Sequence, residues 1–273
     1  MKKIKVMING LPGNMAKLIE VALSRSSDLQ IIPSALTGQG WGESYQGETK
    51  LIKLYEPKYH EEILKQIVAD HQIIAIDFTQ PDGVEKNVRL YCDNNIPFVM
   101  GTTGGNREVL PKLVEASNIS AVIAPNMSAP IVMFMNMIEF AAKNYPGVLK
   151  DWKVRITESH QAKKKDKSGT ALAVGKMLET LGVNFRGLDD IRAVRDQIEQ
   201  RLMGIPEFAL NGHGWHTYDL ISPDGKVVLG FKHNINGRDT YVTGTLMALD
   251  FLAKQVAAGV KGKCFSMKDV MMG

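Results

Sequence analysis

Residues 4–16 of this 273-residue chain read IKVMINGLPGNMA, a run of apolar residues that passes directly into two glycines. The apolar run 4–8 predicts a buried strand, and the apolar spacing within 15–24 predicts a helix. Gly10 and Gly13 allow a tight turn and a close approach of the backbone to a pyrophosphate, which would bind at the N-terminus of the helix. The stretch therefore predicts a dinucleotide-binding turn of the form GxxGxxA at the head of an α/β fold.

The rest of the first half alternates between short apolar runs and helical patterns. Strands are predicted at 30–36, 73–78, 97–100 and 121–124, and helices at 59–69, 84–92 and 107–116. This alternation is typical of a Rossmann-like parallel sheet with helices on both faces. The class is therefore α/β.

Three turns follow strands of this predicted sheet. They read DFTQP at 77–81, GTTG at 101–104 and APNMS at 124–128. Ligands of such sheets bind at the carboxyl ends of the strands, so we expect these turns to line the cofactor crevice.

The predicted second strand ends at residues 34–38 without an acidic residue. A site that prefers NADH usually carries Asp or Glu there for the ribose hydroxyls, and none occurs before Glu43. Ser34, Thr37 and Lys17 are candidate partners for a 2′-phosphate. The sequence thus favours NADPH over NADH.

The second half has a different pattern. It predicts a helix at 133–144, a strand at 152–157, a charged helix at 188–202, and strands at 215–221 and 226–233 joined by the turn residues SPDG. A last helix at 241–256 would return to the first domain. We expect residues 1–127 and 240–273 to form a dinucleotide-binding domain, and residues 128–239 an α+β domain with a mainly antiparallel sheet for substrate binding and tetramerisation.

Residues 158–171, ESHQAKKKDKSGTA, combine a histidine, a run of lysines and a helix start. Ser168 is a good N-cap residue, so the first amides of the helix would point toward the lysines. A solvated loop or a nucleic-acid patch would use the same lysines. The capping residues directly after the charges favour a site for a small dianion, with His160 available for proton transfer.

Composition excludes several other classes. Apolar content of 44%, charged content of 23% and a net charge of +4 are those of an ordinary globular protein. Cys92 and Cys264 lack metal-ligand spacing, and no metal site is predicted. We find no secretory signal pattern and no apolar run long enough for a membrane span, so a cytoplasmic protein without membrane or nucleic-acid partners is expected.

Together these motifs resemble the 4-hydroxy-tetrahydrodipicolinate reductase (dihydrodipicolinate reductase) family of the diaminopimelate route to lysine. The segments occur in family order over nearly the whole chain: the turn at Gly10, DFTQP, GTTG, NMS at 126–128, the E-x-H-x-x-x-K pattern at 158–164, SGTA at 168–171, and Gly237, Arg238 and Gly244. The histidine and lysine pattern combined with SGTA is the specific part. The resemblance implies an NAD(P)H-dependent enzyme that acts as a homotetramer.

The resemblance also assigns roles to residues. His160 would be the active-site histidine and Lys164 the catalytic lysine that donates a proton. The substrate-binding residues would be Gln161, Ser168, Gly169, Thr170 and Arg238, with a carboxylate on the amides of Gly169 and Thr170. The cofactor-binding residues would be Gly10, Gly13, Asn14, Met15, Thr37, Phe78, Thr79, Gly101, Thr102, Thr103, Ala124, Asn126 and Met127.

Several positions depart from the common bacterial pattern. Gln161 replaces a second histidine, and the loop before Ser168 lacks a proline and is one residue shorter. Ala16 replaces the third fingerprint glycine, and Gln80 stands where an arginine is common. The chain therefore looks closer to the plant-like branch of the family, which would place it in the plastid stroma if its source is a plant.

The implied reaction is hydride transfer to ring carbon 4 of a cyclic imine dicarboxylate after its hydroxyl leaves, with a proton added to the neighbouring carbon. Whether His160 or Lys164 donates that proton stays open at this point. The alternatives are another two-domain amino-acid dehydrogenase and a dinucleotide sensor without turnover.

Overall fold

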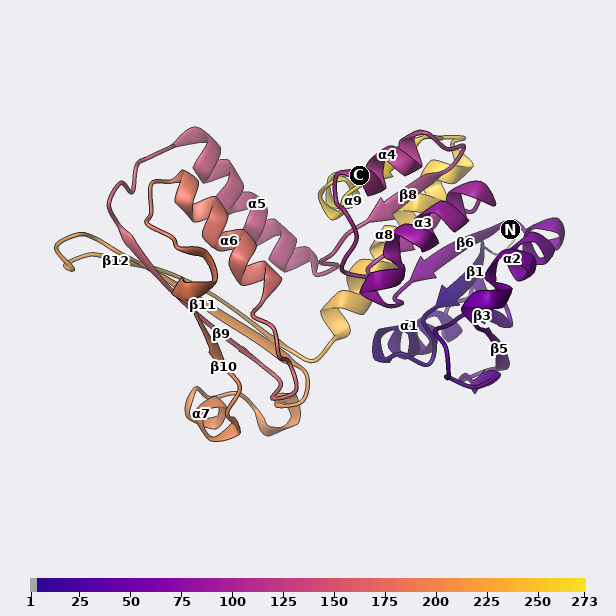
Figure 1. Cartoon of the computed structure of the whole chain (residues 1–273), viewed down its shortest axis with the longest axis horizontal. Coiled ribbons are helices and arrows are strands. Elements are labelled where there is room, and N and C mark those ends of the chain that lie inside the picture. Colours follow the sequence, from indigo (N-terminus) through magenta and orange to yellow (C-terminus); the bar gives the residue numbers. More distant parts are fainter. Residues whose placement is uncertain (1–3) are drawn as a thin grey trace. The chain divides into compact units, whose positions relative to one another are not determined.

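The computed structural model describes residues 4–273 and divides the chain into two compact units. One unit contains the chain up to Ala129 together with Tyr241–Gly273, and the other contains Pro130–Thr240. The first has a parallel sheet with helices on both faces, and the second a smaller mixed sheet (Figure 1). The predicted fold class is confirmed.

The first unit is a Rossmann-like sheet. Its strands are parallel and follow the order β13 (Lys263–Phe265), β8 (Ser120–Ile123), β7 (Phe98–Met100), β6 (Ile73–Asp77), β1 (Ile4–Asn9) and β2 (Leu29–Ile31). Its helices are α1 (Asn14–Ser24), α2 (His60–Asp70), α3 (Val84–Asp93), α4 (Val109–Glu115), α8 (Asp239–Ala257) and α9 (Met267–Met272). The central strands β6 and β7 are buried along their whole length, because both faces of the sheet are covered.

The strand predicted at 30–36 is wrong as a single element. It is divided into β2, in the main sheet, and β3 (Ser34–Leu36), which joins β5 (Leu51–Tyr55) and β4 (Ser44–Gln46) in a separate small sheet. Pro33 lies at the break, and its missing N–H interrupts strand pairing. The sequence analysis did not predict β4, β5, β13 or α9.

The second unit is built on a sheet in the order β10 (Ile191–Val194), β9 (Lys153–His160), β11 (His213–Ile221) and β12 (Val228–Asn236). Only the β9–β10 pair within this sheet is parallel, so the sheet is mainly antiparallel as predicted. Helices α5 (Ala129–Asn144) and α6 (Gly169–Thr180) lie on one face (Figure 1). Apolar residues of both helices pack there against β9 and β11, among them Ile138, Val174, Ile156 and Tyr218.

The charged helix predicted at 188–202 is also wrong in part. Residues 191–194 form the edge strand β10, and α7 (Gln197–Leu202) begins only after Asp196, whose side chain accepts the Glu199 amide. Ile191 and Val194 are buried in β10, and the charged residues around them hid this short strand. Among the described residues, the helices lack the length and apolar character that a membrane crossing requires.

Candidate active site

The predicted glycine turn follows β1 as expected. Gly10 has a φ of +98°, and a Cβ there would lie 2.1 Å from the carbonyl oxygen of Phe78. A Cβ at Gly13 would lie 2.7 Å from the Gly10 oxygen, and Gly13 directly precedes α1. The backbone after β1 is therefore bare and packed against the loop after β6, as a pyrophosphate turn requires.

A pocket of about 410 Å³ adjoins this turn. Predicted cofactor residues that line it are Gly10, Gly13, Thr37, Phe78 and Thr79. They follow β1, β3 and β6, so the pocket lies at carboxyl ends of strands, where nucleotides bind to such sheets. Its size, its bare turn and a lining that combines aromatic with polar side chains fit part of a nicotinamide dinucleotide. Sequence reasoning missed other residues that line it, namely Gln39, Trp41, His60 and Lys86.

A buried carboxylate ties the loops of this crevice together. Asp77 ends β6 and accepts hydrogen bonds from the side chains of Thr79, Asn87 and Tyr91 at 2.7–3.0 Å. The hydroxyl of Thr102, in the loop after β7, donates to Asp77 and accepts the Thr79 amide. The Asp77 and Gly101 motifs are therefore connected, and the Thr102 side chain serves the loops rather than facing a ligand.

The other predicted cofactor residues are more scattered. Gly101 packs on the Phe78 ring, because a Cβ there would lie 2.2 Å from a ring atom. The carbonyl oxygen of Met127 lies against Gly244 of α8. The following residues do not line the 410 Å³ pocket within the described part of the chain: Asn14, Met15, Thr103, Ala124, Asn126 and Met127.

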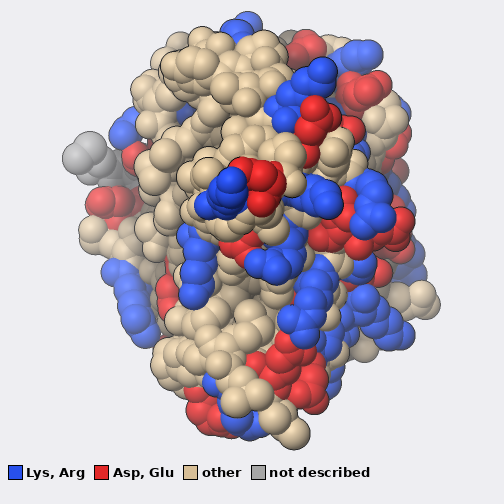
Figure 2. Space-filling model, turned by 90° about the vertical axis from the view of Figure 1, so that its left-hand side faces the viewer, with Lys and Arg blue, Asp and Glu red and all other residues tan. Residues whose placement is uncertain are grey.

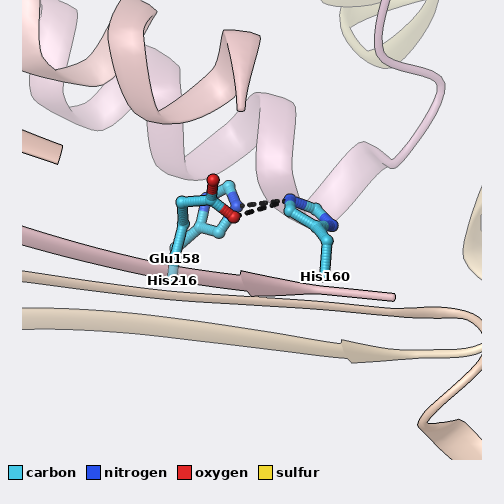
Figure 3. Close-up of side chains that lie close together, drawn as sticks. All are labelled: Glu158, His160 and His216. Carbon is cyan, nitrogen blue, oxygen red and sulfur yellow. Dashed lines mark hydrogen bonds and ion pairs between the residues drawn. The ribbon is translucent and has the colours of Figure 1, made fainter. Parts of the chain in front are cut away.

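In the second unit, His160 is the last residue of β9 and points toward the helix-covered side of the sheet. Glu158, two residues earlier, and His216 on β11 point to the same side (Figure 3). In the β-ladder His216 pairs with Glu158 and Gly214 pairs with His160. A Cβ at Gly214 would lie 3.0 Å from the His160 ring, so this glycine makes room for the imidazole.

Hydrogen bonds fix the tautomer of His160. Its Nδ1 faces the carbonyl oxygen of His213 at 3.1 Å and must donate, which leaves Nε2 as an acceptor for His216 Nε2 at 3.2 Å. His216 Nδ1 in turn contacts the Tyr218 hydroxyl at 3.0 Å, and that hydroxyl contacts His233 Nε2 at 3.3 Å. Four side chains thus form one continuous polar chain across the sheet.

Burial keeps these imidazoles neutral. Desolvation lowers the pKa of His160 to about 4, with the Lys164 and Arg195 charges adding to the effect and Glu158 opposing it. Desolvation and neighbouring imidazoles lower the pKa of His216 to about 2, and desolvation lowers that of His233 to about 4. At neutral pH His160 is therefore an uncharged group with both ring nitrogens engaged.

Glu158 is fully buried, and Arg195, directly after β10, neutralises it. The guanidinium binds both carboxylate oxygens, at 2.7 and 2.9 Å. Glu158, His160 and His216 offer ligand atoms within 4.8 Å of one another, as a metal site would. The Arg195 contacts already satisfy the carboxylate and the two imidazoles share a proton, so hydrogen bonding alone accounts for this cluster.

The start of α6 is organised as predicted. The Ser168 hydroxyl accepts the Ala171 amide, and the Ser168 amide donates to Glu158 at 3.3 Å. The Ser168 amide is therefore engaged within the protein, which leaves the amides of Gly169 and Thr170 at the helix start for a ligand. A Cβ at Gly169 would meet no atom within 4 Å, so the approach to these amides is open.

The remaining predicted residues lie around the same end of the sheet. Lys164 is half-buried, and its charge is close enough to lower the pKa of His160. Gln161 directly follows β9, and its carbonyl accepts the Lys164 amide. Arg238 packs against Gly212, just before β11, and Gly214 of β11 pairs with His160. The strand register thus brings the predicted catalytic and substrate residues to one end of the second unit.

Several residues around His160 were missed in the sequence. The His213 ring contacts the Ser159 hydroxyl at 2.8 Å, Arg195 binds the Glu158 carboxylate, and His216 contacts the His160 imidazole. The buried Gln200 side chain donates to the His160 carbonyl at 2.8 Å. No local pattern in GHGWHTY at 212–218 marks His216, because its place beside His160 depends on the β9–β11 register.

Comparison with known proteins gives a consistent result. The description "Dihydrodipicolinate reductase, N-terminus" matches residues 4–127, and "Dihydrodipicolinate reductase, C-terminus" matches residues 130–271. A probable 4-hydroxy-tetrahydrodipicolinate reductase 1, chloroplastic, of Oryza sativa is 40% identical over 97% of this chain and 78% of its own length. The Arabidopsis thaliana 4-hydroxy-tetrahydrodipicolinate reductase 1, chloroplastic, is 37% identical over 98% and 78%.

Among solved structures, the dipicolinate-bound dihydrodipicolinate reductase of Paenisporosarcina sp. TG-14 has the same fold. The TM-score is 0.63 at 20% identity, and the match covers 97% of each chain. Because the two family descriptions together cover almost all of the sequence, the chain belongs to the dihydrodipicolinate reductase family.

Proposed function

We propose that this protein reduces 4-hydroxy-tetrahydrodipicolinate to tetrahydrodipicolinate with NADPH or NADH, in the diaminopimelate route to lysine. The observation that carries the proposal is the family match over both units, joined to a neutral His160 beside the Lys164 loop and an open helix start. When bound, the cofactor supplies a hydride for ring carbon 4.

In this proposal the protein holds the cofactor with the first unit. The backbone of Gly10 and Gly13 and the N-terminus of α1 take the pyrophosphate, and Phe78 and Thr79 line the same pocket. Asp77 keeps these loops in register through its hydrogen bonds. The segments at 101–103 and 124–127, with Asn14 and Met15, complete the proposed cofactor site.

Lys164 is the proton donor in this mechanism. His160 is neutral at physiological pH and its Nε2 accepts from His216, so the free enzyme has no imidazolium to give a proton. An ammonium carries its proton at neutral pH, and the Lys164 charge acts on the His160 ring. The ring first loses water, made of the hydroxyl on carbon 4 and a proton from the adjacent carbon. The hydride would then add to carbon 4 and the Lys164 ammonium would give a proton to the adjacent carbon, and solvent would reprotonate the resulting amine.

The carboxylates of the substrate require hydrogen-bond donors. The amides of Gly169 and Thr170 at the open start of α6 suit one carboxylate, since a helix N-terminus attracts anions. Arg238 suits the other as a bidentate partner, with Gln161 and the Ser168 region beside them. In this proposal the uncharged imidazole of His160, held in place by its hydrogen bonds, lies next to the substrate ring.

We place NADPH ahead of NADH. The strand end before Gly38 carries no acidic residue, and Lys86 lines the adjoining pocket. Thr37 uses its hydroxyl to donate to the Leu11 carbonyl at 2.6 Å, and Ser34 and Lys17 do not line this pocket within the described residues. Lys86 is therefore the better partner for a 2′-phosphate than Lys17.

We also propose a homotetramer joined through the sheet of the second unit. The edge strand β12 exposes Val228 and Leu229 at 57% and 43%, unusual for apolar residues on a strand that faces only water. The names of the rice and Arabidopsis relatives support a plastid stroma if the source is a plant.

The alternatives have less support. A dinucleotide sensor without turnover would not need the Glu158 to Lys164 pattern or the capped start of α6. Figure 2 shows one face of the molecule on which basic and acidic side chains are intermingled, which does not favour nucleic acid binding. The test is an assay in which the substrate is formed in situ from pyruvate and aspartate semialdehyde while NADPH and NADH are followed. Cofactor oxidation supports the reductase, and tight cofactor binding without oxidation would overturn it.

A further inference from the structure

The loop from Gln161 to Ser168, which carries Lys164, has little to hold it by packing. Ala162, Lys163, Lys165 and Asp166 are exposed, and no buried apolar side chain lies within the loop. Its four lysines also repel one another. A general acid must nevertheless be held within about 0.5 Å of its productive position.

Arg195 supplies the missing constraint. Its Nε donates to the Lys164 carbonyl at 2.8 Å, and one Nη2 hydrogen reaches the Asp166 carbonyl at 3.1 Å. The remaining hydrogens bind the two Glu158 oxygens and the Val194 carbonyl. These contacts match the five N–H donors of a guanidinium, and the Arg195 side chain is only 19% exposed.

The same ion pair also fixes the end of the loop. Glu158 Oε1 accepts the Ser168 amide at 3.3 Å, and Ser168 caps α6. One guanidinium and one carboxylate therefore connect the end of β9, the middle of the loop and the start of α6. Lysine at position 195 could not reproduce this, because an ammonium has three donors without the planar fork.

We infer that Arg195 is the positioning residue of the active site, which holds Lys164 and the anion-binding amides of α6 in their working arrangement through Glu158 and the loop carbonyls. The inference rests on the proposed function for the role of Lys164. It assigns Arg195 no contact with substrate or cofactor.

The test compares Arg195→Lys and Arg195→Met with a matched control, Arg192→Lys. Arg192 lies on β10 and pairs with Glu199 at the surface. We expect kcat/KM for the cyclic substrate to fall by about 100-fold in both Arg195 variants, as for a misplaced catalytic group, with NADPH affinity unchanged. Added guanidinium ion should restore part of the activity of Arg195→Met, and Arg192→Lys should behave as wild type. An Arg195→Lys enzyme within about threefold of wild type would overturn the inference.

A second readout needs no turnover. Amide hydrogen exchange in residues 161–168 should rise by about tenfold or more in Arg195→Lys, while exchange in β11 stays as in wild type. In Arg195→Met the buried Glu158 carboxylate has lost its guanidinium partner, and the double variant Arg195→Met/Glu158→Gln removes this charge. The loop of the double variant should still exchange fast. Recovery of slow exchange would contradict a positioning role. If the wild type fails to turn over, the proposed function fails, and loop exchange still decides the role of Arg195.

Discussion

At the scale of single residues, the ionisation of His160 decides the mechanism. The imidazole is buried, donates from Nδ1 to a backbone carbonyl and accepts at Nε2 from His216. With a pKa of about 4, the His160 imidazole is unprotonated at neutral pH and is a poor general acid there. His160 is therefore an uncharged polar group of the candidate site, which is why we propose Lys164 as the acid.

A prediction at this scale concerns cofactor preference. Replacement of Lys86 by Glu should weaken the binding of NADPH by about tenfold and leave the binding of NADH nearly unchanged. The reason is that a charged contact to the 2′-phosphate is lost and a repulsion is gained. The control is Lys17→Glu, on α1 outside the pocket. Steady-state kinetics with each cofactor provides the measurement. Equal losses for NADPH and NADH would show that Lys86 does not face the 2′-position.

The sequence was informative about residues where chemistry and local spacing coincide. The Gly10 turn and the Ser168 cap were predicted from a few adjacent positions, whereas the strand predicted at 152–157 extends to His160. Glu158, Arg195 and His216 form one cluster only because the β9–β10 and β9–β11 registers place them together. No local spacing encodes such a register, so these partners could not be inferred as a set.

At the scale of elements, hydrophobic periodicity predicted the long helices and central strands and failed for short edge pieces. β10 is only four residues long and lies between charged residues, and Pro33 divides a run that looks continuous. In both places, local charge or one proline outweighed the apolar pattern.

The turn between β1 and α1 gives a prediction at this scale. Gly10→Ala should lower the free energy of unfolding by roughly 1–3 kcal/mol and weaken the binding of the dinucleotide, since Gly10 has a positive φ and faces the Phe78 carbonyl. Gly259, after α8, has a φ of +74° with open space around it and does not line the 410 Å³ pocket, so Gly259→Ala should leave cofactor affinity unchanged. Urea unfolding and cofactor titration measure both effects. Normal cofactor affinity in Gly10→Ala would contradict the assignment of the turn.

The histidine chain of the second unit predicts a dependence of stability on pH. His160 and His233 have folded-state pKa values near 4, below the value of about 6.5 in an unfolded chain. Between these values the unfolded state binds more protons, so stability should fall as the pH drops from about 6.5 to 4 and be constant just above. For one histidine whose pKa is lowered to about 4, the loss of unfolding free energy in acid is at most about 3 kcal/mol.

Urea unfolding at pH 7, 6 and 5 tests this point. Trp152 and Trp215 report on the second unit in a Trp41→Phe background. His216→Asn should flatten the pH dependence, and His71→Asn in the first unit should not. If the unfolding free energy of His216→Asn depended on pH as in wild type, the histidine chain would not control stability in acid.

At the scale of the whole molecule, the division of labour between two units follows from what each lacks. We propose that the first unit, which has the bare turn and the pocket at the strand ends, holds the cofactor, and that the second, which has Lys164 and the open helix start, holds the substrate.

Assembly is the prediction at this scale. The wild type should be a tetramer by light scattering after size-exclusion chromatography, and Val228→Lys should dissociate it because a charge is placed on the proposed β12 interface. Leu202→Lys, at an exposed position of α7, serves as control. A monomeric wild type, or a tetramer that is indifferent to the β12 charge, would refute the proposed interface.

The central claim is that the chain reduces the cyclic imine dicarboxylate with Lys164 as the acid. The most direct measurement is oxidation of NADPH and NADH, with the substrate generated in situ, by wild type, Lys164→Ala and the exposed neighbour variant Lys163→Ala. We predict rapid oxidation by wild type and Lys163→Ala and a fall in kcat of about 100-fold or more in Lys164→Ala, with cofactor affinity retained. Equal activity of Lys164→Ala and wild type would contradict the assignment of the acid, and an inactive wild type that still binds the cofactor would contradict the reductase itself.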